Sequence, residues 1–162
     1  MRGFLVAGNW KMNGSIAANA DLVDGILAGV PASGQVELLV CPPFPYLSQV
    51  SEKLAGSAVM LGAQTASEHD AGAYTGETAV SMLAEMGCSH VIVGHSERRA
   101  LYGESSDDVA RKFAAVQAAG LTPILCVGET LAQREAGETE SVIDEQLNAV
   151  LDSAGAAAFG AA

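Results

Sequence analysis

Basic residues are scarce in this chain. It carries 8 lysines and arginines against 19 aspartates and glutamates, which gives a formal net charge of −11. Because nucleic acids and anionic membranes attract positive charge, this balance argues against both as partners. The acidic residues gather at 68–70, 104–108 and 135–145, where we expect solvent-facing turns and helix surfaces.

Cysteine is scarce as well. The three cysteines lie far apart, at positions 41, 88 and 126, among apolar neighbours. Such an odd, dispersed set is typical of buried thiols in a reducing compartment rather than of a disulfide framework. Cys88 lies near His90 and His95 in the sequence, but their spacing matches no zinc motif. We therefore predict no metal site.

Long apolar runs and the common signature motifs are missing too. The first apolar stretch, Phe4–Ala7, is far too short for a signal peptide or a membrane span. We therefore expect a cytoplasmic protein without a membrane partner. The sequence contains no G-x-G-x-x-G, no P-loop and no G-x-S-x-G motif, which argues against the enzyme classes that depend on them.

What the chain does contain is a regular series of short apolar runs. They begin near Phe4, Val36, Ala58, His90 and Leu121. Their almost continuous apolarity, in place of strict alternation, predicts strands that are covered on both faces. The regular alternation of strand and helix predicts a parallel sheet with right-handed crossovers. We interpret residues 1–162 as a single domain, since no interior stretch has the composition of a linker.

Helical periodicity occupies the segments between these runs. Ser15 is expected to cap the first helix, and Ser105 or Ser106 the fourth. The second helix is placed at Phe44–Leu54. The apolar residues expected to face the core in the other helices are Leu22, Val23, Ile26 and Leu27 in the first; Val80, Leu83 and Ala84 in the third; Val109, Phe113 and Val116 in the fourth; and Val142, Ile143, Leu147, Val150 and Leu151 in the fifth.

Polar residues follow several of the predicted strands. Asn9 and Lys11 follow the first strand, Gln64 the third and His95 the fourth. Polar side chains that come from the ends of several strands to form one site are typical of a barrel rim. An open sheet usually has a glycine-rich first turn, which this sequence lacks. Physical reasoning therefore favours a (β/α)8 barrel over an open doubly wound sheet.

The chemistry of these residues suits an anionic substrate. Lys11 offers a compact positive charge, and Asn9 could orient an ammonium group or a substrate oxygen. His95 precedes a short helix whose positive end favours a neutral ring. Glu97 could bridge to Lys11 or move protons. Each residue also has a purely structural interpretation. Lys11 could be a lysine that extends from a strand end, and Asn9 could form a turn. His95 could be bonded to the backbone, and Glu97 could form an ion pair.

Two further features are expected to be structural or interfacial. Arg98 and Arg99 are predicted to pair with acids such as Glu77 or Glu104. The loop from Gln64 to Glu77 is long and rich in small residues, and loops of this length inside compact domains tend to be functional. It is either an arm that docks into a partner subunit or a mobile surface loop.

Five segments of the chain together resemble the triosephosphate isomerase family in order and spacing. They are Gly8–Asn13, Gly62–Gln64, Gly72–Glu77, Val93–Arg99 and Cys126–Leu131. The resemblance extends from Met1 to about Leu151. It implies a (β/α)8 TIM barrel, an isomerase of glycolysis and gluconeogenesis that interconverts dihydroxyacetone phosphate and glyceraldehyde 3-phosphate, no cofactor, and a homodimer.

The resemblance also implies roles for individual residues. Lys11 and Asn9 would contact the phosphorylated triose and stabilise the charge of the enediolate. His95 would be the neutral electrophile that polarises the carbonyl group, with Glu97 as a supporting acid near Lys11. Thr75, at the tip of the long loop, would insert beside the site of the neighbouring subunit.

The same resemblance places Tyr74 and Gln64, together with Thr75, at the interface of the dimer.

The chain departs from the family in its length. A complete barrel of this type needs about 250 residues, whereas this sequence has 162. The family's catalytic glutamate, lid and phosphate loops lie beyond the fifth strand, and no segment here resembles them. We therefore expect about five βα units that carry the electrophilic half of the site. We also expect the isolated chain to be poorly soluble, loosely packed or oligomeric.

Two other functions compete with isomerisation. The barrel fragment could be a non-catalytic module for structure or self-association. It could also belong to another phosphosugar barrel enzyme, such as an epimerase or an aldolase. An aldolase would need a Schiff-base lysine, and the second to fifth predicted strands contain none.

Overall fold

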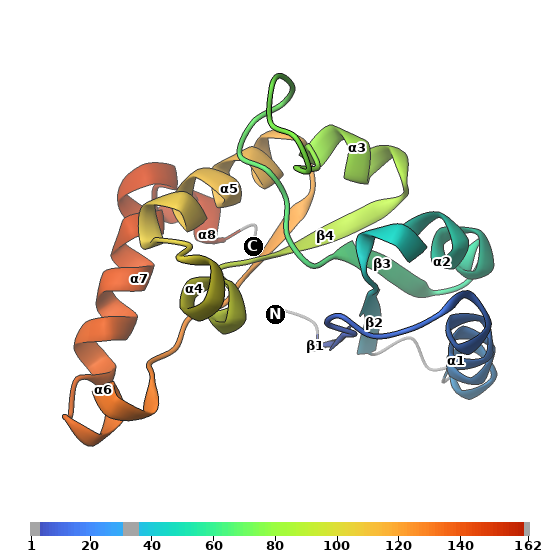
Figure 1. The fold of residues 1–162 in the computed structure, drawn as a ribbon, viewed down its shortest axis with the longest axis horizontal. Coiled ribbons are helices and arrows are strands. Elements are labelled where there is room, and N and C mark those ends of the chain that lie inside the picture. The colour runs from blue at the N-terminus through green and yellow to red at the C-terminus, as the bar shows by residue number, and fades with distance from the viewer. Residues whose placement is uncertain (1–3, 31–35, 161–162) are drawn as a thin grey trace.

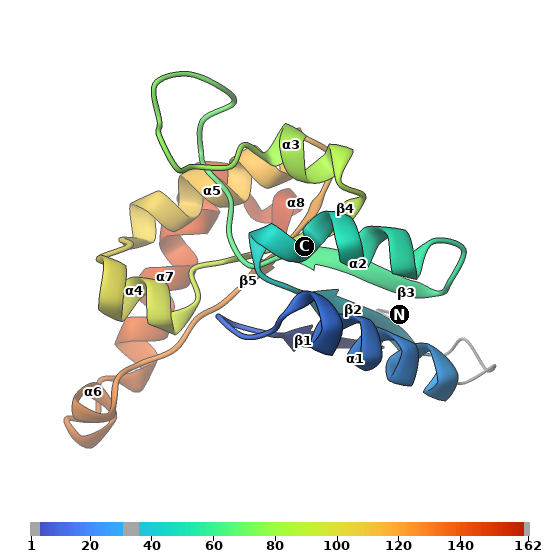
Figure 2. The same ribbon diagram turned by 45° about the vertical axis from the view of Figure 1, so that its right-hand side comes forward.

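The computed structural model describes residues 4–30 and 36–160 and contains one parallel sheet (Figure 1). Its strands follow one another in chain order, from β1 at one edge to β5 at the other. Figures 1 and 2 show that the sheet is curled, as in half of a barrel. The strands are β1 (Phe4–Asn9), β2 (Val36–Cys41), β3 (Val59–Ala63), β4 (Cys88–Val93) and β5 (Thr122–Leu125).

The predicted alternation of strands and helices is confirmed. The strand β4 begins at Cys88, two residues before the predicted start at His90. The helical elements are α1 (Ile16–Gly29), the 3-10 turn η1 (Phe44–Tyr46), α2 (Leu47–Leu54), α3 (Val80–Glu85), α4 (Ser96–Tyr102), α5 (Ser106–Ala118), α6 (Leu131–Glu135), α7 (Thr139–Ala154) and α8 (Ala156–Phe159).

The apolar core has two layers, one on each face of the sheet. Successive residues of a strand point to opposite faces. In β2, Val40 packs into the larger cluster with helix residues such as Phe113, while Leu39 and Cys41 form a smaller cluster with Ile92. The larger layer therefore lies under the helices, and the smaller one lies on the concave face.

In α1, one residue that helical periodicity assigned to the core is exposed. Val23 is almost fully buried, but Leu22, which was predicted to share its core face, is 47% exposed. The helix α1 lies at the edge of the sheet and packs against α2. It therefore buries a narrower strip than a helix with neighbours on both sides. Ala84 of α3 was also predicted to face the core and is exposed.

Ser105 caps α5, which decides between the two serines left open by the sequence. Its hydroxyl accepts a hydrogen bond from the Asp108 amide at 3.1 Å, and the Asp108 carboxylate accepts one from the Ser105 amide at 2.9 Å. The helix then buries Val109, Phe113 and Val116 completely, as predicted.

Replacing Ser105 with alanine should lower the free energy of unfolding by about 1 kcal/mol, because the Asp108 amide loses its acceptor and the Asp108 carboxylate loses the donor hydroxyl. Chemical denaturation would measure the change. Ser153→Ala, at an exposed position inside α7, is the matched control and should change stability far less. Equal effects of the two substitutions would contradict the role of the cap.

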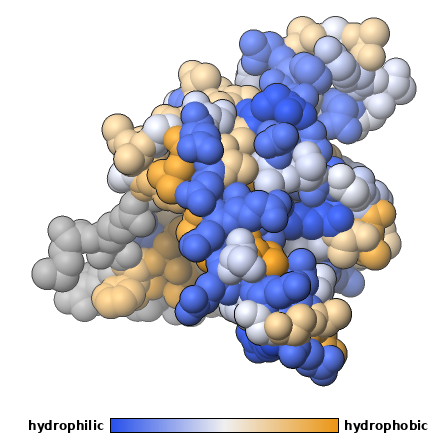
Figure 3. All heavy atoms as spheres, turned by 90° about the vertical axis from the view of Figure 1, so that its left-hand side faces the viewer, coloured by the Kyte–Doolittle hydropathy of each residue, from blue (hydrophilic) through white to orange (hydrophobic). Residues whose placement is uncertain are grey.

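The predicted acidic surface is confirmed at 135–145, and Glu104 departs from it most. The acids of 135–145 are exposed, and Figure 3 shows that hydrophilic side chains dominate the side of the molecule on which α6 and α7 lie. Glu104, however, was predicted to face solvent, and it is buried with 9% exposure. None of the helices in the described segments is long and apolar enough to cross a membrane.

The two edge strands leave apolar surface open. In the described part of the chain β1 pairs only with β2, and β5 only with β4. On β1, Phe4 is 77% exposed and Val6 is 59% exposed. Unpaired edges of this kind bind the strands of other chains.

We therefore expect the isolated 162-residue chain to self-associate with increasing concentration in analytical ultracentrifugation. Val6→Lys should reduce the association, because a charge on an edge strand opposes strand pairing. Leu131→Lys changes an exposed apolar residue of α6 and should leave the association unchanged. A monodisperse monomer that melts cooperatively would show the expectation to be wrong.

Candidate active site

A pocket of about 390 Å³ opens at the carboxyl ends of the strands. Asn9 ends β1, Gln64 follows β3 directly, and His95 comes two residues after β4. Because neighbouring parallel strands end at the same edge of the sheet, these side chains meet there. The pocket is lined by Asn9, Lys11, Gln64, His95 and Glu97, together with Met12, Pro43, Phe44, Pro45, Thr65, Arg98 and Tyr102.

Lys11 and Glu97 form an ion pair in this pocket. The Lys11 Nζ atom lies 2.8 Å from Glu97 Oε1, and both side chains are about half exposed. The hydrogen bond from Lys11, and then the positive charge of Lys11, hold the pKa of Glu97 below its usual range. The sequence left two roles open for Glu97, a bridge to Lys11 and the movement of protons. The structure shows the bridge to Lys11.

His95 caps the short helix α4 with its own ring. Its Nδ1 atom accepts a hydrogen bond from the Glu97 amide at 3.3 Å. A nitrogen that accepts carries no proton, so the proton of the neutral ring is on Nε2. The same Nδ1 lies 3.5 Å from Glu97 Oε2. Protonation at Nδ1 would therefore exchange the backbone hydrogen bond for an ion pair.

The backbone of Lys11 has an unusual conformation. Its φ is +54°, and within the described ranges no other residue except glycine has a positive φ. The Lys11 amide donates to Asn9 Oδ1 at 2.9 Å, and the Lys11 carbonyl accepts from Gln64 Nε2 at 2.9 Å. The Asn9 oxygen thus stabilises a turn, which was one of its two predicted roles. Nothing in the sequence indicated the left-handed backbone, because lysine rarely adopts it.

The two arginines after His95 differ in their partners. Arg98 pairs with Glu104 at 3.0 Å, as predicted. The prediction that Arg99 pairs with an acid is wrong. Among the described residues it forms no ion pair, and its guanidinium group donates to the carbonyls of Gly94 at 2.8 Å and Cys126 at 3.4 Å and to the Ser106 hydroxyl at 3.2 Å. Arg99 therefore joins the ends of β4 and β5.

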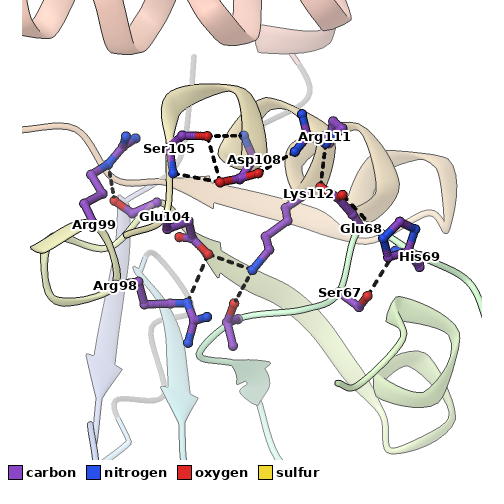
Figure 4. A network of polar contacts seen from close by, with 12 residues as sticks. Ser67, Glu68, His69, Arg98, Arg99, Glu104, Ser105, Asp108, Arg111 and Lys112 are labelled. Atoms are coloured by element: carbon purple, nitrogen blue, oxygen red, sulfur yellow. Dashed lines mark hydrogen bonds and ion pairs between the residues drawn. The ribbon is translucent and has the colours of Figure 1, made fainter. Parts of the chain in front are cut away.

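A buried ion pair between Glu104 and Lys112 contacts Arg98, which lines the pocket (Figure 4). Glu104 Oε1 lies 2.6 Å from Lys112 Nζ and 3.0 Å from Arg98 Nε. Burial alone would raise the pKa of Glu104, but the hydrogen bonds from Lys112 and Arg98 outweigh it and lower the pKa. Sequence reasoning missed Lys112. Its position on the buried face of α5, three residues after Val109, was the available signal.

The long loop between β3 and α3 projects from the body of the molecule (Figure 2). On it, Tyr74 stacks on His69 with ring centroids 3.9 Å apart and stays 44% exposed. Thr75 is exposed beside it. Of the predicted interface residues, Gln64 therefore lines the pocket of its own chain, whereas Tyr74 and Thr75 lie apart from that pocket.

The cysteines and the metal-binding side chains can be placed as well. Cys41, Cys88 and Cys126 are free thiols. Cys41 and Cys88 are buried, as predicted, whereas Cys126, which was also predicted to be buried, is only partly so. Burial raises the pKa of Cys41 to about 12 and that of Cys88 to about 11. In the segments that the structure describes, no three histidine, cysteine, aspartate or glutamate side chains are grouped as metal ligands would be.

Comparison with known proteins shows which family the chain belongs to. Residues 4–161 match the triosephosphate isomerase family. The triosephosphate isomerase of Dechloromonas aromatica is 60% identical over all 162 residues, which is 65% of its own length. That of Thiobacillus denitrificans is 59% identical over 162 residues, or 64% of its length. That of Nitrosomonas europaea is 54% identical over 159 residues, or 98% of this chain and 63% of its own length.

The chain thus spans just under two thirds of the length of these relatives. Its curled five-stranded sheet corresponds to a truncated TIM barrel. The match over residues 4–161 shows that the chain belongs to the triosephosphate isomerase family.

Proposed function

We propose that this chain supplies the electrophilic half of an active site that interconverts dihydroxyacetone phosphate and glyceraldehyde 3-phosphate, an aldose–ketose isomerisation of glycolysis and gluconeogenesis. One observation carries the proposal. The Lys11 ammonium group and the His95 ring, delivered by β1 and β4, line the same pocket, with Glu97 bound to both. A three-carbon anion can therefore contact both groups together.

The reaction moves a proton between adjacent carbons and places negative charge on the substrate oxygen. The neutral His95 ring would donate from Nε2 to that oxygen, and triosephosphate isomerase is itself the standard example of a neutral catalytic histidine. Lys11 would attract the anionic triose and stabilise the enediolate charge. Asn9 would orient a substrate oxygen through its amide nitrogen, since its Oδ1 is bound to Lys11. Glu97 would hold the ammonium group in place.

In this proposal the general base and the phosphate loops come from the part of the relatives' length that this chain does not span. A positioned base contributes about 10²–10⁴-fold to the rate. The 162-residue chain alone should therefore turn over triose phosphates much more slowly than a full-length relative.

We further propose that the complete protein is a cytoplasmic homodimer. The loop from Gln64 to Glu77 would dock on a second copy, with Thr75 beside the partner's pocket and Tyr74 and Gln64 at the interface. Two observations support the docking. The loop projects into solvent, and its exposed Tyr74 ring is held by stacking on His69.

An isomerase assay tests the function in three forms: the chain alone, the chain with a polypeptide that supplies the remaining βα units of the Dechloromonas aromatica relative, and the full-length fusion of the two. We expect activity in the fusion, partial recovery on complementation and little in the chain alone. Full turnover by the chain alone would overturn our account of the base.

The alternative is a non-catalytic barrel fragment that acts in structure or self-association, and the open edge of β1 favours it. An inactive fusion that folds and melts cooperatively would exclude the isomerase and support this alternative.

A further inference from the structure

Gln64 makes two hydrogen bonds with a single nitrogen. Its Nε2 atom donates to the Lys11 carbonyl at 2.9 Å and to the Cys41 carbonyl at 2.8 Å. Lys11 follows β1, Cys41 ends β2 and Gln64 follows β3. One amide group therefore joins the ends of three neighbouring strands at the rim of the pocket.

Lys11, whose carbonyl accepts one of these bonds, is the residue of the site with a left-handed backbone conformation. A residue with a Cβ atom keeps a positive φ only where its surroundings fix both of its peptide groups. Asn9 holds the Lys11 amide, and Gln64 holds the Lys11 carbonyl. Without the Gln64 bond, rotation to the ordinary negative φ would redirect the Cα–Cβ bond and carry the ammonium group away from Glu97.

Other side chains bond to the backbone of the loop after β1 and to the first residue of α1. Asn13 donates to the Trp10 carbonyl at 2.8 Å, Tyr46 to the Gly14 carbonyl at 3.2 Å, and Gln49 to the Ile16 carbonyl at 2.6 Å. These bonds fix the neighbours of Lys11. The bond from Gln64 fixes Lys11 itself.

We propose that Gln64 is a positioning residue, whose amide locks Lys11 in its left-handed conformation and thereby aims the ammonium group at the substrate pocket. This role in catalysis rests on the proposed function. The positioning itself does not, since the Lys11–Glu97 ion pair exists without substrate. The two parts can therefore be tested separately.

The test compares two glutamine substitutions in the full-length fusion. Gln64→Met keeps the length of the side chain and removes both donors. Gln49→Met is the matched control, because it removes one glutamine bond to a nearby backbone carbonyl, that of Ile16 at the start of α1. An NMR titration of the Glu97 carboxyl group reports the ion pair, the backbone coupling of Lys11 reports its φ, and steady-state kinetics report catalysis.

We expect Gln64→Met to raise the pKa of Glu97 toward its ordinary range, as Lys11→Met would, and to change the Lys11 coupling. A misplacement of about 1 Å can reduce the rate about 10²-fold, and we expect a fall of this order in kcat/KM. Gln49→Met should leave the Glu97 titration and the Lys11 coupling as they are in the unsubstituted protein.

An unchanged Glu97 titration in Gln64→Met would overturn the proposal, and so would an equal change in Gln49→Met, which would indicate general loosening of the loop. If Gln64→Met fails to fold, Gln64→Asn keeps an amide with a shorter reach and gives the same comparison. If the unsubstituted fusion is inactive, the proposed function fails, while the titration and the coupling still decide the positioning role.

Discussion

Replacing Lys11 with methionine should lower kcat/KM of the full-length protein by roughly 10²–10³-fold, the loss typical of removing one group that stabilises charge in the transition state. Methionine keeps much of the length and apolar surface of the lysine side chain and removes its charge. The substitution therefore tests the ammonium group rather than the packing around it. Steady-state kinetics in both directions of the isomerisation would measure the effect.

Lys53→Met is the matched control for this substitution. Lys53 also forms a 2.8 Å ion pair, with Asp24, but it lies on α2 outside the pocket. Exposed ion pairs contribute little to stability, so this variant should fold and retain full activity. If Lys11→Met were as active as Lys53→Met, the proposed site would be wrong.

The second large effect is on stability. Glu104→Gln should destabilise the protein by roughly 3–5 kcal/mol at neutral pH, because it leaves Lys112 buried without its counter-charge. The Lys112 side chain is only 10% exposed and the Glu104 side chain 4%. Glu68→Gln is the control. Glu68, whose side chain is 21% exposed, pairs with the half-exposed Arg111, so its replacement should cost much less than that of Glu104.

The same pair predicts a pH dependence. The folded pKa of Glu104 is lowered, so the stability it contributes is present above the unfolded pKa and is lost as the pH falls through the folded pKa. The difference between the unsubstituted protein and Glu104→Gln should therefore shrink on acidification below the ordinary carboxyl range. Urea unfolding at a series of pH values would measure it. A difference that stays constant over this range would contradict the assignment.

Much of the fold could be predicted from the sequence because the signals are local. Strand positions followed from apolar runs, and the ends of α5 from Ser105 and Gly120. The meeting of Asn9, Lys11, Gln64 and His95 also followed, since parallel strands must end at one edge. These expectations need only the periodicity of each segment and the alternation of strand with helix.

The predictions that were wrong depended on contacts between distant parts of the chain. Arg99 was assigned an acidic partner from the charges near it in the sequence, yet the groups that it reaches include the Cys126 carbonyl, 27 residues away. Leu22 fitted the helical pattern, but its burial depended on whether another element covered that side of α1. Glu104 fitted an exposed acidic turn, but it is buried because it pairs with the buried Lys112.

By itself the sequence determined which segments form strands and helices and which polar side chains stand at the rim, because both follow from local spacing. Only the tertiary structure decided how those side chains are held. The left-handed backbone of Lys11 is fixed by Gln64, 53 residues further along the chain. Such a conformation is unfavourable locally and becomes stable only when distant parts of the chain supply its hydrogen bonds.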